Sequence, residues 1–282
     1  MFESIGRSFA LVGTSWNILM DDKKLLVFPV LSGIVTLLVI LTFVLPLLVT
    51  GAFMSLAPAG PVFYYGLLFL FYVVSYFVVI FFNTALISCV NAQLNGKDMS
   101  VGEGLSNSTR HLPAILGWAI VSATVGLVLH LLEERSGLVG QIVLSLVGGV
   151  WSLVTYFVVP VLVLEDKGVV DSVKESFSLI RKTWGESIVG TASIVIVFVI
   201  IGAIAGIGLV ATLILGNTAL FVATLALFLL LVVILAVVYS AMQGIYVTAL
   251  YTYAKTGSVP SAFSPDLIRN AFAPKQAGPG NI

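Results

Sequence analysis

The most prominent pattern in the chain is a series of six long apolar stretches separated by short polar segments. A helix needs roughly 20 residues to cross a hydrocarbon core of about 30 Å, and each stretch is long enough. We predict membrane-spanning helices at Leu25–Val49, Val62–Val90, Leu112–Leu132, Leu138–Leu164, Ser187–Leu215 and Ala219–Tyr246. The connecting segments Thr50–Pro61, Glu133–Gly137 and Gly216–Asn217 are short, so we expect three hairpins of two spans each.

A second pattern is a stretch of sequence that occurs twice, at Glu3–Trp16 and at Asp171–Trp184. In both copies large apolar residues recur at alternating spacings of four and three, which places them on one face of a helix. An amphipathic helix that ends at a Trp and leads into a membrane span is typical of a segment lying in the lipid headgroup layer. We therefore predict two interfacial helices with these membrane-interface anchors: Phe9, Trp16, Lys23, Lys24, Phe177, Arg181, Lys182 and Trp184.

The basic residues predict the orientation of the spans. Of the 13 Lys and Arg residues, all but Arg135 fall on one side of the predicted membrane. By the positive-inside rule that side is the cytoplasm, so we expect a multi-pass protein of the cytoplasmic (inner) membrane with both termini inside. Arg135 lies on the outer side beside His130, Glu133 and Glu134, a group that favours a solvated helix end over a metal-binding or pH-sensing role.

The leader helices divide the chain into three units. A weaker third copy at Glu103–Leu116, interrupted by Pro113, precedes the third span. The predicted fold class is an all-α integral membrane protein with six transmembrane helices in three hairpins, each preceded by a cytoplasmic amphipathic interfacial helix, as a pseudo-repeat. The expected units are residues 1–96, 97–166 and 167–254, followed by a partly disordered cytoplasmic tail at 255–282.

Composition supports the membrane assignment and narrows the chemistry. Hydrophobic residues make up 59% of the chain and charged residues 9%, with a mean hydropathy of +1.14. The equal numbers of basic and acidic residues predict no attraction to nucleic acid. Cys89 is the only cysteine, and the sequence has neither an HExxH motif nor a phosphate-binding loop nor a GxSxG turn. We expect no catalytic residues, no metal and no cofactor, and so a protein that is not an enzyme.

Uncharged polar residues gather near the cytoplasmic ends of the second, fourth and sixth spans. Amide side chains that faced lipid would lack hydrogen-bond partners, so they are expected to point inward. If the three units surround a common axis, the polar residues would converge on a cavity open to the cytoplasm. In the other interpretation they bond only to neighbouring helices. The candidate cavity residues are Asn83, Thr84, Ser88, Asn91, Thr155, Tyr156, Gln243 and Tyr246.

The chain resembles a family of uncharacterised bacterial six-span inner-membrane proteins. The residues that carry the resemblance are Phe9, Ser15 and Trp16, the motif from Asp22 to Leu31, Asn83 to Leu86, and Asp171 to Trp184. More distantly, the layout is similar to the membrane domain attached to some glycerophosphodiester phosphodiesterases, whose acidic metal-binding barrel this sequence lacks. The resemblance implies a topology and supplies no site residues.

Two functions remain open from the sequence. We expect a non-enzymatic membrane protein that acts through membrane lipids or through a partner, either a second copy in a homo-oligomer or another membrane protein. The alternative is a passive channel or facilitator for a small uncharged solute, with the polar residues as its lining. A pore needs polar or small residues across the whole membrane, whereas the outer halves of the spans, such as Leu37–Val44 and Leu225–Val233, are apolar throughout.

Overall fold

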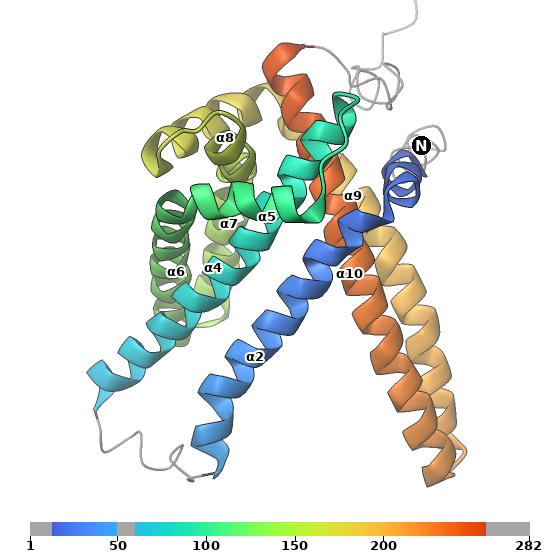
Figure 1. The fold of residues 1–282 in the computed structure, drawn as a ribbon. Helices are drawn as coiled ribbons and strands as arrows, with labels where there is room; N and C mark the ends of the chain where they lie inside the picture. Colours follow the sequence, from blue (N-terminus) through green and yellow to red (C-terminus); the bar gives the residue numbers. More distant parts are fainter. Residues whose placement is uncertain (1–12, 50–59, 258–282) are drawn as a thin grey trace, which may run out of the picture.

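The computed structural model describes residues 13–49 and 60–257, and all of its regular secondary structure is helical (Figure 1). Residues 13–21 form a helix that precedes the short 3-10 helix η1, Lys23–Leu26. The further helices are α2 (Val27–Val49), α4 (Pro61–Leu94), α5 (Val101–Arg110), α6 (Leu112–Glu134), α7 (Leu138–Val154), α8 (Val158–Leu164), α9 (Val169–Ile214) and α10 (Thr218–Thr256). Most of the first predicted leader and the tail beyond residue 257 lie outside the described residues.

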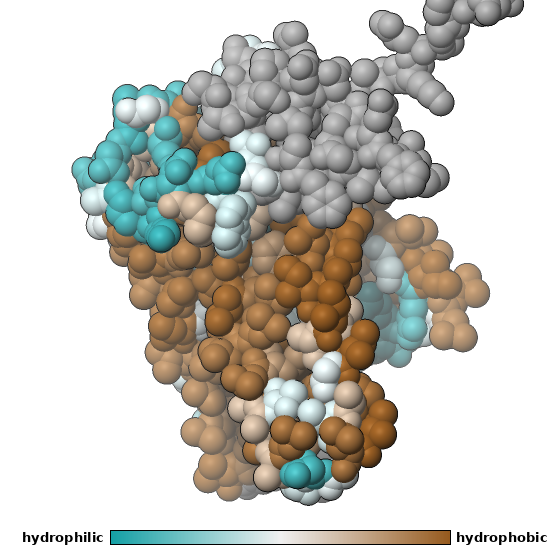
Figure 2. Space-filling model, turned by 90° about the vertical axis from the view of Figure 1, so that its right-hand side faces the viewer, coloured by the Kyte–Doolittle hydropathy of each residue, from teal (hydrophilic) through white to brown (hydrophobic). Residues whose placement is uncertain are grey.

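The six predicted membrane spans are confirmed. Helical segments long and apolar enough to cross a membrane occupy Lys23–Val49, Val62–Leu94, Leu112–Glu134, Leu138–Leu164, Thr191–Ile214 and Thr218–Thr256. Large apolar side chains along these helices are exposed, and Figure 2 shows a broad hydrophobic surface below hydrophilic residues at the upper end. A surface of this kind is stable only with lipid as its solvent.

The buried core lies at the upper end of the bundle and is built mainly from the second, fourth and sixth spans. Leu86 of α4, Phe157 and Val161 of the fourth span, and Ile245 and Leu250 of α10 are at most 1% exposed. Toward the other end, α2 and α4 diverge from the α9–α10 pair (Figure 1). Tight packing therefore concentrates where the uncharged polar residues also lie.

The fourth span is interrupted at residues 155–157, between α7 and α8. Pro160 has no N–H to donate to the carbonyl of residue 156, which weakens a continuous helix here. Ser176 of α9 bridges the interruption: its hydroxyl donates to the Val154 carbonyl oxygen at 2.7 Å and accepts from the Phe157 amide at 3.0 Å. Ser176 is fully buried and thus holds the turn that contains Tyr156.

The helices that precede the third and fifth spans are set off from those spans by local breaks. α5 begins with a capping box between Ser100 and Glu103 and ends at Arg110, because the next helix starts at Leu112 with a proline in its first turn. α9 bends at Thr183, whose φ of −129° and ψ of 20° are not helical. The part of α9 before this bend therefore runs in a different direction from the membrane span that follows.

Candidate functional site

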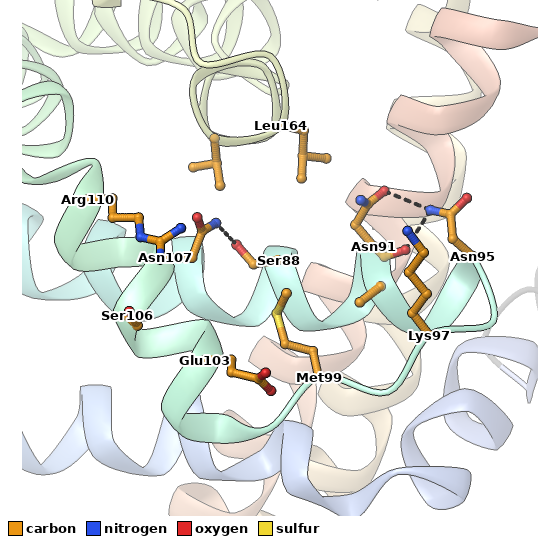
Figure 3. Close-up of a pocket in the computed structure, with 12 residues that line it drawn as sticks. Ser88, Asn91, Asn95, Lys97, Met99, Glu103, Ser106, Asn107, Arg110 and Leu164 are labelled. Carbon is orange, nitrogen blue, oxygen red and sulfur yellow. Dashed lines mark hydrogen bonds between the residues drawn. The ribbon is translucent and has the colours of Figure 1, made fainter.

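A polar groove opens where α4 ends and α5 crosses it (Figure 3). We name it the α4–α5 groove; its volume is about 670 Å³, within the range of roughly 300–1,000 Å³ typical of small-molecule sites. Asn91 and Asn95 line it from α4 because residues four apart share a helix face. Asn107 lines it from α5, and Val163 and Leu164 of α8 supply an apolar wall.

Hydrogen bonds hold part of the groove lining in place. The Asn107 amide donates to the Ser88 hydroxyl at 2.8 Å, and that hydroxyl donates to the Thr84 carbonyl at 2.8 Å. The Asn95 amide donates to the Asn91 carbonyl at 2.7 Å. The side chains of Ser88 and Asn107, which come from two helices, are thereby fixed against each other before any ligand binds.

The charged groups of the groove favour an anion. Figure 3 places Arg110 at one end of the groove and Lys97 at the other, and neither makes an ion pair with any residue that the structure describes. Glu103 is the one acidic residue in the lining, and it accepts 2.7 Å hydrogen bonds from the Ser100 amide and hydroxyl. The backbone hydrogen bond, followed by the hydroxyl, lowers the pKa of Glu103. Glu103 therefore stays ionised at the helix cap, and the groove lining holds two cations against one anion.

A second polar cavity lies between the second, fourth and sixth spans, and we name it the inter-span cavity. It has a volume of about 190 Å³, and its polar lining includes Asn83, Tyr156 and Gln243, one from each span. The Gln243 amide donates to the Thr191 hydroxyl at 3.1 Å, and that hydroxyl is 3.0 Å from the Tyr156 hydroxyl. Gln243 Oε1 is buried without a hydrogen-bond partner among the described residues.

The candidate cavity residues thus divide among several places. Asn83, Tyr156 and Gln243 meet in the inter-span cavity, whereas Ser88 and Asn91 line the α4–α5 groove. Thr84 and Tyr246 are buried in the core, at 0% and 2% exposed. The reason is geometric: residues at spacings of three and four still drift around a helix, so the upper and lower parts of one polar stripe meet different neighbours.

Thr155 lines a third cavity, of about 430 Å³, between α4, α6 and α7. Trp118 and Trp151 stack in its wall with their ring centroids 5.9 Å apart. The Thr155 hydroxyl donates to the Trp151 carbonyl at 2.8 Å, so it is already paired within the fourth span. These contacts give Thr155 and both Trp residues a packing role.

Two of the predicted anchors are well placed for a membrane surface. Trp16 is 44% exposed and Phe177 46% exposed, although both are large and apolar. The Arg181 guanidinium lies 5.9 Å from the centroid of the Phe177 ring, a cation–π contact.

The remaining predicted anchors differ in what the structure describes of them. Lys23 is exposed, whereas Lys24 pairs with Asp98 at 2.8 Å and is therefore engaged with the protein. Phe9 lies outside the described residues. Lys182 and Trp184 lie in α9, but their side chains are outside the described part of the structure.

An ionic ring that the sequence did not predict joins α9 and α10 to the end of α8. Lys255 lies 3.0 Å from Glu165 and 2.8 Å from Glu175, and Lys167 lies 2.8 Å and 3.5 Å from the same two carboxylates. The Tyr251 hydroxyl also donates to Glu165 at 2.7 Å. Partial burial alone would raise the pKa of Glu165, but hydrogen bonds from Lys167, Tyr251 and Lys255 lower it to about 2. No local signal could reveal this ring, since Lys255 lies 90 residues from Glu165.

In the group that the sequence places on the outer side, His130 lies close to the carboxylate of Glu134. His130 Nε2 lies 3.3 Å from Glu134 Oε1, and the Tyr65 hydroxyl donates to Glu134 at 3.3 Å. Among the described residues, no three His, Cys, Asp or Glu side chains cluster as metal ligands do. The geometry therefore gives Glu134 a role in tying α4 to the end of α6.

Comparison with known proteins places the chain in a family without assigning it an activity. No curated protein and no solved structure matches it. A family model matches residues 62–261, which include the second to sixth spans, the α4–α5 groove and the inter-span cavity. This match supports the resemblance to an uncharacterised family, while the similarity to the membrane domain of phosphodiesterases stays a prediction. The chain belongs to the family of unknown function DUF6159.

Proposed function

We propose that this multi-pass membrane protein acts by binding anionic lipid, with the phosphate of the headgroup held in the α4–α5 groove. The observation that carries the proposal is the pair Lys97 and Arg110, which face the groove with no ion pair among the described residues. Arg and Lys donate several hydrogen bonds to phosphate oxygens, and the amides of Asn91 and Asn107 are in reach of the same volume.

The position of the groove favours a lipid over a free anion. It lies where α4 ends at Leu94, at the end of the second span. Its wall also contains the apolar side chains of Met99, Val163 and Leu164. A lipid presents phosphate and hydrocarbon side by side, and juxtamembrane cations attract anionic headgroups by about 1 kcal/mol each. The groove matches that combination of chemistry, which supports binding as the function.

The proposal includes an orientation in the inner membrane with the groove and both termini on the cytoplasmic side. The basic residues of the groove and of the leader helices support it by the positive-inside rule. Cysteine labelling in a Cys89→Ser background tests it, because Lys174 is exposed on one predicted side and Arg135 on the other. We expect an impermeant maleimide added to intact cells to label Arg135→Cys and to spare Lys174→Cys.

The proposal also includes the three-unit arrangement. Ser108 and Ser176, which correspond in the weak third copy of the leader, are both fully buried. Each donates to a carbonyl of the preceding span, Ser108 to Phe81 at 3.0 Å and Ser176 to Val154 at 2.7 Å. Ile18 belongs to the same buried cluster as residues of α4 and α10, and its carbonyl accepts a hydrogen bond from the Gln93 amide at 3.3 Å. A helix that seats on the preceding even span in both the second and the third unit supports a pseudo-repeat around a common axis.

Native mass spectrometry in nanodiscs tests the lipid-binding function. We expect the wild type to retain phosphatidylglycerol from a phosphatidylcholine background, and Lys97→Gln/Arg110→Gln to retain it roughly thirtyfold less tightly. The control Arg135→Gln/Lys174→Gln removes the same charge from exposed positions outside the groove and should bind as the wild type does. Glycerol phosphate added in excess tests whether the headgroup alone suffices. Equal retention by the two double variants would contradict a site in the groove.

A further inference from the structure

The inter-span cavity has as its neighbour an apolar groove on the α9–α10 pair. This second groove has a volume of about 400 Å³, and Tyr239 lines both it and the inter-span cavity. Its lining includes Phe198 and Gly202 of α9 and Val232 and Ala236 of α10, with no charged residue. The two volumes meet at Tyr239, and taken as one elongated site they have a polar end and an apolar end.

The sequence explains why the two volumes are neighbours. On α10, Val232, Ala236, Tyr239 and Gln243 follow at spacings of four, three and four, so they line one helix face. On α9 the same spacing leads from Thr191, which bonds Gln243, to Val195 and on to the apolar groove. Both faces change from polar to apolar in the same direction along the membrane.

The polar end presents unused hydrogen-bonding groups and no charge. One end of the Gln243 amide bonds Thr191, and the other end is buried without a described partner, whichever way the amide is turned. The Tyr156 hydroxyl lies 3.0 Å from the Thr191 hydroxyl, and either oxygen can donate in this hydrogen bond. The Asn83 amide makes no hydrogen bond with the residues that the structure describes and lines the same cavity.

We propose that this elongated site binds a neutral amphiphile: a lipid whose uncharged head group carries hydroxyl or carbonyl groups and whose hydrocarbon chain lies in the apolar groove. The head group would bond the unpaired end of the Gln243 amide and the Asn83 amide, which satisfies polar groups that the described residues leave unpaired. A charged head group is disfavoured because the cavity lining offers no opposite charge, and an unpaired charge inside a membrane is costly. The site is thus distinct in chemistry and position from the α4–α5 groove.

Photolabelling of the protein in phosphatidylcholine nanodiscs tests this site. The probe is a monoacylglycerol with a diazirine in its acyl chain, and the expected labels fall on peptides of α9 and α10. Gln243→Leu removes the polar contact and should reduce labelling about tenfold. Gly202→Leu should reduce it as strongly, because a side chain at Gly202 enters open space in the apolar groove. Excess monoolein should compete with the probe.

Matched variants separate this site from a structural effect and from the lipid site on the cytoplasmic side. Gln141→Leu and Gly208→Leu make the same chemical changes outside the site and should label as the wild type does. Lys97→Gln/Arg110→Gln should also leave labelling intact, so that the two proposals fail independently. Equal labelling of Gln243→Leu, Gly202→Leu and their controls would overturn the proposal. Competition by acetamide but not by monoolein would overturn it in favour of a small solute.

Discussion

Replacing Ser176 with alanine removes one hydroxyl that serves two backbone groups at the interruption of the fourth span. The Val154 carbonyl is at the last position of α7 and the Phe157 amide precedes α8, so both lie at helix ends. Groups at helix ends lack the partners of a helix interior, and lipid offers none. At roughly 1–3 kcal/mol for each buried group left unpaired, we expect Ser176→Ala to destabilise the protein by about 2–5 kcal/mol.

Two other serines provide an internal scale for this prediction. Ser108 donates to the Phe81 carbonyl, which lies inside α4 and keeps its helical environment, so Ser108→Ala should cost only about 1 kcal/mol. Ser152 donates within its own helix to the Gly148 carbonyl and is exposed, so Ser152→Ala should change stability by less than about 0.5 kcal/mol. The three variants delete the same atom and differ in what that atom bonds and in how deeply it is buried.

Unfolding in mixed micelles of a mild detergent and dodecyl sulfate measures these differences, and hydrogen exchange locates them. Ser176→Ala should unfold at the lowest dodecyl sulfate fraction of the three. Its amides at residues 156–158 should exchange faster than those of the wild type, because the turn there has lost its bridge. The reasoning is refuted if Ser176→Ala and Ser152→Ala unfold together and the exchange of residues 156–158 is unchanged.

Three further predictions concern packing and charge. Gly104→Ala should destabilise by about 1–3 kcal/mol because its methyl group would lie 2.7 Å from Cys89 Sγ, whereas Gly102→Ala meets open space and should be neutral or stabilising; melting temperatures compare them. Glu165→Gln breaks the ionic ring and should cost on the order of 2 kcal/mol, against less than about 0.5 kcal/mol for Asp171→Asn in an exposed pair. The pKa of Glu165 lies at about 2 instead of 4.5, so its stabilisation is complete above about pH 5 and is lost as the pH falls toward 2. The difference in melting temperature between wild type and Glu165→Gln should therefore narrow from pH 5 to pH 3; a constant difference would argue against the ring.

The spans were predictable because lipid imposes a simple rule on the chain. A segment that crosses the membrane must be apolar for about 20 residues and satisfy its own backbone as a helix. The predicted stretch Leu138–Leu164 and the observed span have the same ends. The last predicted span stops before the end of α10, because the helix continues past the apolar stretch as far as Lys255 and its neighbours. Pro160 indicates that the fourth span can kink, but the turn at residues 155–157 could not be predicted, since its stability comes from Ser176, in another helix.

The sequence predicts which polar side chains point inward, but it does not predict which of them share a cavity. Amides such as Asn83 and Gln243 had to point inward, because lipid cannot satisfy them. Whether two of them share a cavity depends on how the spans rotate against one another, which the spacing along one helix does not determine. Arg110 and Lys97 were counted only as markers of orientation, although together with Asn107 they line the α4–α5 groove. The sequence signal that could have revealed this role of Arg110 and Lys97 is the capping box of α5, a short helix that comes soon after the second span.

The central claim is that the α4–α5 groove holds the phosphate of an anionic lipid. Electron cryo-microscopy of the protein in nanodiscs that contain phosphatidylglycerol, with a rigid binding fragment to add mass, tests it most directly. The account predicts phosphate density in the groove within hydrogen-bonding distance of Lys97 Nζ or the Arg110 guanidinium, and its loss in Lys97→Gln/Arg110→Gln. An ordered groove without lipid density, in a map that resolves lipids elsewhere on the protein, would contradict the account.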